Sequence, residues 1–116
     1  MRFGVYQFGS LSVDGVTYHT DIVIDQGEVR KRHKRASAEQ RELYGHTPLS
    51  AREEIPWNCR ELVIGTGAMG QMPVLDDVIE EARRRKVKLV IQRTPDAIRT
   101  LKANPPETNA ILHMTC

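Results

Sequence analysis

Two short apolar runs that flank a segment of helical periodicity constrain the fold more than any other feature of the sequence. Residues 61–64 and 88–92 are rich in Leu, Val and Ile, as expected of strands that are covered on both faces. We expect a helix between them, with Pro73 in its first turn and Asp76 and Asp77 complementing its positive end. Apolar residues recur at roughly helical spacing and form one face of this helix: Val74, Leu75, Val78, Ile79 and Ala82.

A second helix and a final strand follow in the sequence. The tripeptide Thr94-Pro95-Asp96 is typical of a helix start, with Thr94 as the N-cap, a proline at the first helical position and an acid in the first turn. The helix is expected to end before Asn104, and residues 110–115 are expected to close the chain as a strand. The second half of the chain therefore has the order β-α-β-α-β.

The first third of the chain predicts antiparallel hairpins. Asp14-Gly15 stands between β-favouring residues, which is the pattern most typical of a type I′ turn. Residues 17–25 favour a strand, Gln26-Gly27 provides a second turn, and Val29 begins a return strand. We therefore expect three short antiparallel strands in this part of the chain.

Residues 37–56 carry weaker signals and form the connecting segment. Ser37 with Gln40, and Ser50 with Glu53, have the spacing of a capping box, in which the second side chain satisfies a free amide at a helix start. These pairs predict short helical turns. We expect Trp57, just beyond them, to anchor the segment on the core.

Length and composition predict one globular domain that spans residues 1–116. A chain of 116 residues buries roughly two-thirds of the surface that it exposes when unfolded. The 17 Lys and Arg against 15 Asp and Glu leave a net charge of +2, which gives no strong whole-molecule field. The sequence has no apolar run long enough for a membrane helix and no signal peptide, so we expect a cytoplasmic protein without membrane contact.

The segment at residues 65–70 matches the letters of the dinucleotide fingerprint G-x-G-x-x-G. Met72-Pro73 delays the following helix, and Gln92-Arg93 stands where an acid should hold the ribose hydroxyls, although an arginine there could suit the 2′-phosphate of NADP. Too little chain follows Arg93 for the rest of a doubly wound fold. We therefore interpret the glycines as a turn that needs positive φ angles, and we expect no cofactor, although a small anion on the amides stays open.

The run of six basic residues at positions 30–35 is the candidate partner surface. Its candidate contacts are Arg30, Lys31, Arg32, Lys34 and Arg35. Neighbours in a strand point to opposite faces, so the run cannot present a single six-charge stripe. It also lacks interleaved aromatic residues for stacking on bases, and we therefore do not expect nucleic acid as the partner. An edge strand protected by charge and an acidic protein partner remain the two interpretations.

The histidines and cysteines do not predict a metal site or a nucleophile. His113 and Cys116 are three residues apart, which places them on opposite faces of a strand, and neither forms a tight ligand cluster with His46 or Cys59. A cysteine nucleophile needs a neighbouring base and a lowered pKa, and the sequence indicates neither for Cys59. Two cysteines make no disulfide framework, so we expect reduced thiols.

An ordered set of motifs spread over nearly the whole chain resembles one family. The set comprises residues 8–11 with 13–15 and Tyr18, Gly45-His46 before Leu49-Ser50, residues 62–67, residues 94–97 and residues 112–116. It is similar to the small uncharacterised domain shared by mitochondrial respiratory complex I assembly factor 3 and the adipogenesis-associated protein of animals. The resemblance implies a three-layer α/β domain with a central mixed sheet, helices packed on it and a small N-terminal antiparallel hairpin layer. It implies no catalytic residue, and its best-described members act as assembly or regulatory factors through protein contacts.

Two functions of different classes follow from these observations. The first is a non-catalytic accessory domain that binds an unidentified protein partner, with a homodimer left open. The alternative is a small-molecule or anion-binding protein or enzyme, because ligands of open α/β sheets collect beyond the carboxyl ends of the strands. The residues expected to line that pocket are Gly65, Thr66, Gly67, Met69, Arg93 and Thr94. We favour the first function because the sequence contains no catalytic constellation.

Overall fold

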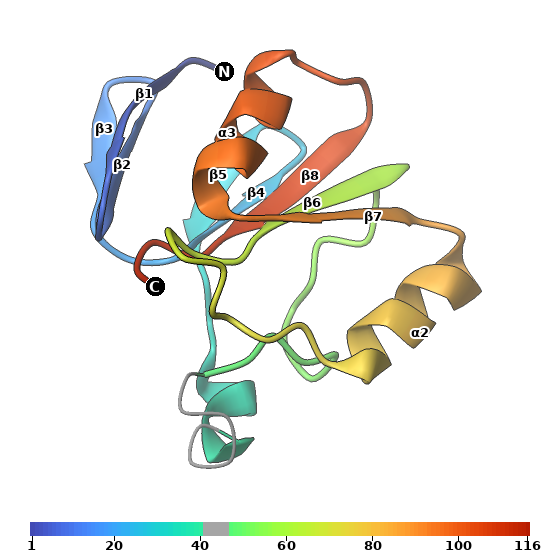
Figure 1. Ribbon diagram of the computed structural model, residues 1–116. Helices are drawn as coiled ribbons and strands as arrows, with labels where there is room; N and C mark the ends of the chain where they lie inside the picture. The colour runs from blue at the N-terminus through green and yellow to red at the C-terminus, as the bar shows by residue number, and fades with distance from the viewer. Residues whose placement is uncertain (41–46) are drawn as a thin grey trace.

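Strands from both halves of the chain meet in one central sheet (Figure 1). In the computed structural model, which describes residues 1–40 and 47–116, five strands lie in the order β5-β4-β8-β6-β7. They are β4 (Ile22–Asp25), β5 (Glu28–Lys31), β6 (Glu61–Gly65), β7 (Lys88–Gln92) and β8 (Thr108–Leu112). Because β6 pairs in parallel with β7 and β8, while β4 pairs antiparallel with β5 and β8, the sheet is mixed.

A second, smaller sheet precedes the central one. Its antiparallel strands are β1 (Phe3–Gln7), β2 (Ser10–Val13) and β3 (Val16–Tyr18). Both expected hairpin turns form, and Asp14-Gly15 and Gln26-Gly27 have φ angles of 50° and 81°, as a type I′ turn requires. The expectation of three strands is wrong: residues 17–25 divide between β3 and β4, because the chain crosses there from one sheet to the other.

Two α-helices connect the parallel strands, as the sequence predicts. They are α2 (Asp76–Arg85) and α3 (Thr94–Lys102). The start of α2 at Asp76 corrects the expectation that Pro73 lies in its first turn. Residues 73–75 instead bond to Leu49, whose amide donates to the Pro73 carbonyl at 2.8 Å. Within the described residues, no helix has both the length and the apolar surface that crossing a membrane requires.

The last helix and the last strand differ from the prediction for a shared reason. Thr94 is the first residue of α3 rather than its N-cap, and its side chain makes no capping bond. Its hydroxyl instead donates to the carbonyl of His113 at 2.6 Å. β8 ends at Leu112 rather than at residue 115, because the chain leaves the sheet at His113 to cross the glycine-rich turn.

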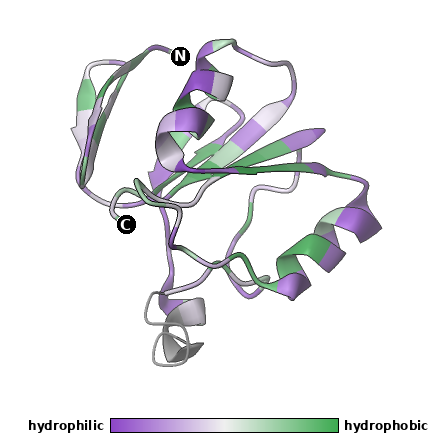
Figure 2. Ribbon diagram, viewed as in Figure 1, coloured by the Kyte–Doolittle hydropathy of each residue, from purple (hydrophilic) through white to green (hydrophobic). Residues whose placement is uncertain are grey.

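The core lies on both faces of the central sheet, so the architecture has three layers. Alternate residues of β6 separate the faces: Val63 packs toward α3 and the small sheet, while Leu62 and Ile64 pack toward α2 and the connecting segment. Figure 2 shows the strands of the sheet as a largely hydrophobic centre between the helices. This arrangement confirms the predicted α/β class, with its central mixed sheet and N-terminal hairpin layer.

The connecting segment packs against the α2 face of the sheet. A 3-10 helix, η1 (Arg35–Gln40), confirms one expected helical turn. Trp57 packs on the core of this face, as predicted, and the Arg85 guanidinium lies 5.5 Å from the centre of its ring. His46, one of the candidate metal ligands in the sequence, lies outside the described residues.

We predict that Gly67 tolerates no side chain, because two independent constraints act on it. Its φ angle is +106°, and a Cβ atom there would lie 2.3 Å from the backbone carbon of Cys116. We expect Gly67→Ala to lower the free energy of unfolding by about 3 kcal/mol. Gly27→Ala is the control, since φ is +81° there but nothing lies within 4 Å, and a loss of about 1 kcal/mol is expected. Urea unfolding followed by circular dichroism measures both, and equal losses would contradict the clash.

Candidate functional site

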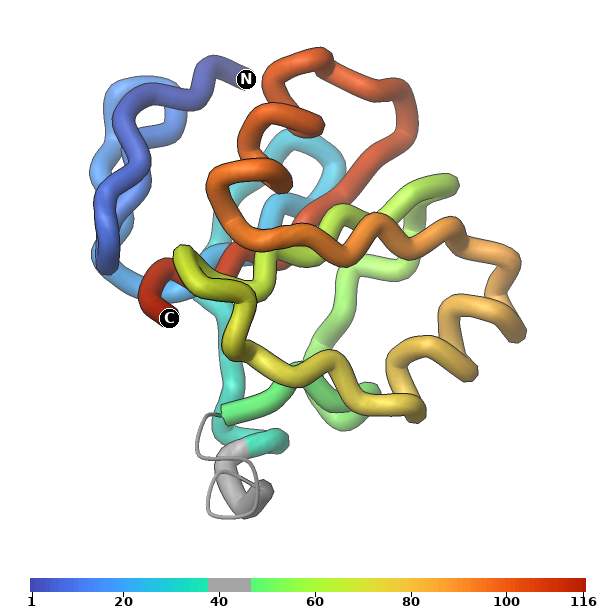
Figure 3. The backbone as a smooth tube through the Cα atoms, in the orientation of Figure 1, coloured from blue at the N-terminus to red at the C-terminus, as the bar shows by residue number. Residues whose placement is uncertain are grey.

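The glycine-rich turn at residues 65–70 is closed by another part of the same chain. The amide of Ala68 donates to the carbonyl of Thr115 at 2.7 Å, and the amide of Gln71 donates to that of Cys116 at 2.8 Å. The amide of Gly67 donates to the hydroxyl of Thr94 at 2.8 Å. In Figure 3 the red hook at the C-terminal end lies against the yellow-green turn. The amides that a phosphate would need therefore already have protein acceptors.

The structure brings the six predicted pocket residues to one end of the sheet. Four of them are buried: Gly65, Thr66, Gly67 and Thr94. The hydroxyl of Thr66 donates to the carbonyl of Gln92, and the guanidinium of the exposed Arg93 lies 3.5 Å from Asp96. Met69 is 68% exposed, and its thioether side chain offers no strong hydrogen-bonding group to a ligand. A ligand at this turn would have to displace residues 115 and 116.

Arg32 does not belong to the surface, which corrects its place in the predicted partner site. Its side chain is only 1% exposed, because it lies between two carboxylates that come from remote segments of the chain. The guanidinium donates to Glu53 at 2.7 and 2.8 Å and to Asp21 at 2.9 Å. It also donates to the carbonyl of Pro48 at 2.9 Å. A buried guanidinium needs such partners, since an unpaired charge in the interior is costly.

We call this group the Arg32 cluster, which consists of Asp21, Arg32, Ser37, Ser50, Glu53 and His113. The second carboxylate oxygen of Glu53 accepts the hydroxyl of Ser37, which lies 2.6 Å from the hydroxyl of Ser50. His113 Nδ1 lies 2.8 Å from Asp21. Ser50 and Glu53 do not form the expected capping box, because the Glu53 carboxylate faces Arg32. All six members are buried, so the cluster is not an open catalytic site. It holds remote segments of the chain together, and we call this role a structural tie.

The surroundings of Asp21 lower the pKa of its carboxyl group. Burial opposes its charge, but the hydrogen bond and charge of His113, the amide of Met114 and the charge of Arg32 outweigh burial. Together they lower the pKa of Asp21 from 3.8 to about 2. Because the pKa in the folded state is the lower one, this stabilisation is complete above about pH 4 and is lost as the pH falls toward 2.

Three cations beside the cluster form what we call the basic rim: Lys31, Lys34 and Arg35. All three are exposed, and together with Arg32, Arg52, Glu53 and Glu54 they line a depression of about 850 Å³. Five cationic and two carboxylate side chains line this hollow, so its charge is positive. Arg30 lies outside the rim, because its guanidinium donates to the carbonyl of Glu54 at 2.9 Å.

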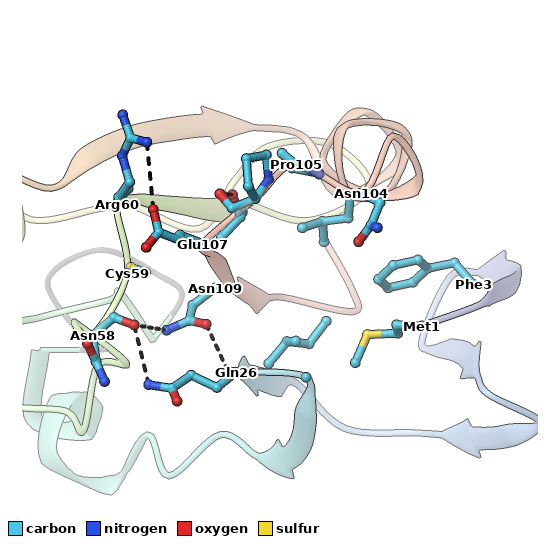
Figure 4. A pocket seen from close by; sticks show the side chains of 15 residues that line it. Met1, Phe3, Gln26, Asn58, Cys59, Arg60, Asn104, Pro105, Glu107 and Asn109 are labelled. Carbon is cyan, nitrogen blue, oxygen red and sulfur yellow. Dashed lines mark hydrogen bonds and ion pairs between the residues drawn. The ribbon is translucent and has the colours of Figure 1, made fainter.

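A second cavity, which we call the Asn109 cavity, opens at the opposite end of the sheet (Figure 4). It has a volume of about 820 Å³, and none of the six predicted pocket residues lines it. Met1 and Phe3 give it an apolar side, while Gln26, Asn58 and Asn109 give it a polar side. The side-chain amide of Asn109 donates to the carbonyl of Pro56 at 2.9 Å, so it shapes the wall.

Among the described residues, Cys59 and His113 belong to different sites. Cys59 lines the Asn109 cavity, and burial together with the charge of Asp25 raises the pKa of its thiol, although a backbone hydrogen bond from Asn109 lowers it. A raised pKa disfavours the thiolate, which is the nucleophilic form of Cys59. His113 serves the Arg32 cluster. Among the described residues, no three or more His, Cys, Asp or Glu side chains are grouped to hold a metal ion.

The chain belongs to a family described as a protein of unknown function (DUF498/DUF598), whose profile matches residues 3–107. No curated protein matches the chain. The family thus supports the expected uncharacterised small domain, and it assigns no reaction, ligand or partner.

Solved structures share the fold along the whole chain. A conserved hypothetical protein of Pyrococcus horikoshii is 24% identical, with a TM-score of 0.85 and full coverage of both chains. The protein MT938 is also 24% identical, with a TM-score of 0.73 over 98% of this chain and 97% of its own. A Bordetella pertussis protein described as an Mth938-like domain is 18% identical, with a TM-score of 0.63 over 97% of this chain and 84% of its own. At these identities the likeness concerns the fold alone.

The Arg32 cluster is the feature that sequence reasoning missed. Its members come from five separate stretches of sequence, and no spacing rule connects them. The available signal was that one cation in a strand-like run must point inward, since neighbouring residues alternate between faces. The sequence could not say which cation does so.

We predict that Arg32 contributes far more to stability than its neighbours in the basic run. Arg32→Met leaves Asp21 and Glu53 buried without their cation, so the free energy of unfolding should fall by about 3–5 kcal/mol. Lys31→Met changes an exposed side chain and should stay within about 0.5 kcal/mol of wild type. Thermal and urea unfolding measure both variants. Equal stability of the two would show that the cluster is not a structural tie.

Proposed function

We propose that this chain is a non-catalytic accessory domain that binds an acidic protein partner through the basic rim. The observation that carries the proposal is the contrast within one short run: Arg32 is buried, while Lys31, Lys34 and Arg35 are exposed around one depression. A net charge of only +2 conceals this local concentration of positive charge. Such a patch attracts a complementary acidic surface and steers its approach.

The Arg32 cluster supports binding because it holds the rim in place. The guanidinium of Arg32 bonds to Asp21, Glu53 and the carbonyl of Pro48, so the backbone between Lys31 and Lys34 is anchored. A surface that is ordered before binding loses less conformational entropy when a partner docks. The rim is therefore prepared for recognition rather than assembled by it.

The non-catalytic part of the proposal rests on the state of the polar groups. The ionisable side chains of the Arg32 cluster are satisfied by one another, and none of them is left open toward a substrate. The resemblance of the sequence motifs to the domain of a complex I assembly factor points in the same direction. Assembly and regulation by protein contacts are accordingly the kind of work that we propose.

Reversing the charge of the rim should abolish partner capture. The test compares a triple variant, Lys31→Glu with Lys34→Glu and Arg35→Glu, against a control with the same charge change at the exposed Arg2, Lys86 and Lys102. From nuclease-treated extract of the native organism, wild type and control should retain one stoichiometric acidic protein, and the rim variant should lose it at least about tenfold. Equal retention by both variants, or retention that nuclease removes, would overturn the proposal.

A second candidate function is small-molecule binding, and the Asn109 cavity favours it. The cavity is about 820 Å³ in volume and combines an apolar side with amide side chains, a composition typical of ligand sites. This location replaces the glycine-rich turn, whose amides are occupied by residues 115 and 116.

A ligand panel tests this second candidate. Free nucleosides, nucleotides and other small metabolites at about 1 mM should include one that raises Tm by about 5 °C, because binding to the native state adds to its stability. Asn58→Trp places a large side chain at the exposed mouth of the cavity and should abolish the shift, whereas Asn58→Ser should keep it. A panel without any shift would remove this candidate.

A further inference from the structure

The two edges of the central sheet differ in the charge that they carry. At the β5 edge, the guanidinium of Arg30 donates to the carbonyl of Glu54 at 2.9 Å, which places part of the connecting segment on the α2 face of that strand. At the other edge, within the described residues, no strand pairs with the outer side of β7. In Figure 1 β7 crosses in front of β6 and β8, between α3 and α2.

The backbone of β7 offers unpaired groups at this edge. The amide of Lys88 donates to the carbonyl of Arg60 at 2.9 Å, and the carbonyl of Gln92 accepts the amide of Thr66 at 2.8 Å. Residues 88, 90 and 92 therefore turn their backbone groups toward β6. Because these groups alternate along a strand, Leu89 and Ile91 turn theirs away from the sheet.

The side chains of β7 do little to prevent pairing. Natural edge strands are usually protected by charges, prolines or bulges. The other edge, β5, has three charged residues among four, whereas β7 carries only Lys88 and holds a regular register with β6 along its whole length. Ile91 is 44% exposed at this edge. A regular and partly exposed edge with a single charged residue is suited to receive another strand.

We propose that β7 pairs antiparallel with β7 of a second copy of this chain, about a two-fold axis at Val90. In this register Leu89 lies opposite Ile91 of the second copy, and the outward backbone groups of both residues are satisfied. The two side chains also meet on one face as an apolar cross-strand pair. The central sheets of the two copies join into one continuous sheet.

The charges at the edge fit a second copy. In the two-fold register, Lys88 lies opposite the neutral Gln92 of the other copy, so no like charges face each other directly. Arg93 of that copy, the residue after Gln92, has its charge offset by Asp96 at 3.5 Å. One pair of short strands buries less than the roughly 1,200 Å² of a stable interface, so the dimer should be weak, with a Kd on the order of 10–100 µM.

Sedimentation equilibrium between about 5 and 500 µM tests the pairing, since this range spans the expected Kd. The mass of wild type should rise from 13.2 kDa toward twice that value. Ile91→Pro removes an outward N–H without breaking a bond to β6 and should remain monomeric. Ile91→Thr keeps both the N–H and the branched side chain and should still dimerise. If Ile91→Pro fails to fold, Ile91→Lys replaces it, since it introduces a charge into the interface.

Hydrogen exchange gives a second readout that needs no variant. The amides of Leu89 and Ile91 should exchange about three- to sixfold more slowly at the highest concentration than at the lowest, because only the dimer protects them. The proposal is overturned if wild type stays at 13.2 kDa with unchanged exchange, or if Ile91→Pro dimerises as wild type does. Protection that arises only when another protein is added would assign the edge to that protein instead.

Discussion

A guanidinium enclosed by carboxylates ties together the segments on which the rest of this structure depends. Arg32 follows β5, Asp21 precedes β4, His113 follows β8, and Glu53 comes from the connecting segment. Taking one charge out of water is costly unless its partners come with it, so these segments must assemble together. The cluster thus fixes where the chain passes between its two sheets, and it directs the last residues over the glycine-rich turn.

The sequence predicts those parts of the fold whose causes are local. Asp14-Gly15 forms its turn because both residues accept a positive φ angle, and β6 and β7 follow from short apolar runs. The errors arise where a remote partner decides. Pro73 lies outside α2 because Leu49 binds it, and Thr94 does not cap α3 because its hydroxyl serves His113. Local preference is a weak prior where tertiary hydrogen bonds compete with it.

The candidate site, like the fold, could be predicted only where its causes are local in the sequence. Alternation along a strand shows that the basic run cannot form one stripe, but the choice of Arg32 as the inward residue depends on carboxylates 11 and 21 residues away. The motif at residues 65–70 matches a nucleotide-binding pattern because both need amides that point outward from a glycine turn. Peptide carbonyls satisfy such amides as well as phosphate oxygens do. Here residues 115 and 116 supply them.

The two proposed binding surfaces lie at opposite edges of the central sheet, and this separation has a consequence. The basic rim adjoins β5, and the self-pairing edge is β7, so neither surface covers the other. In a two-fold dimer joined at β7, the rims lie at the far ends of the extended sheet. A partner that presents two acidic segments at a matching distance then gains from the higher effective concentration of its second contact. A partner with one such segment gains nothing, so the geometry of the dimer selects for partners that are themselves multivalent.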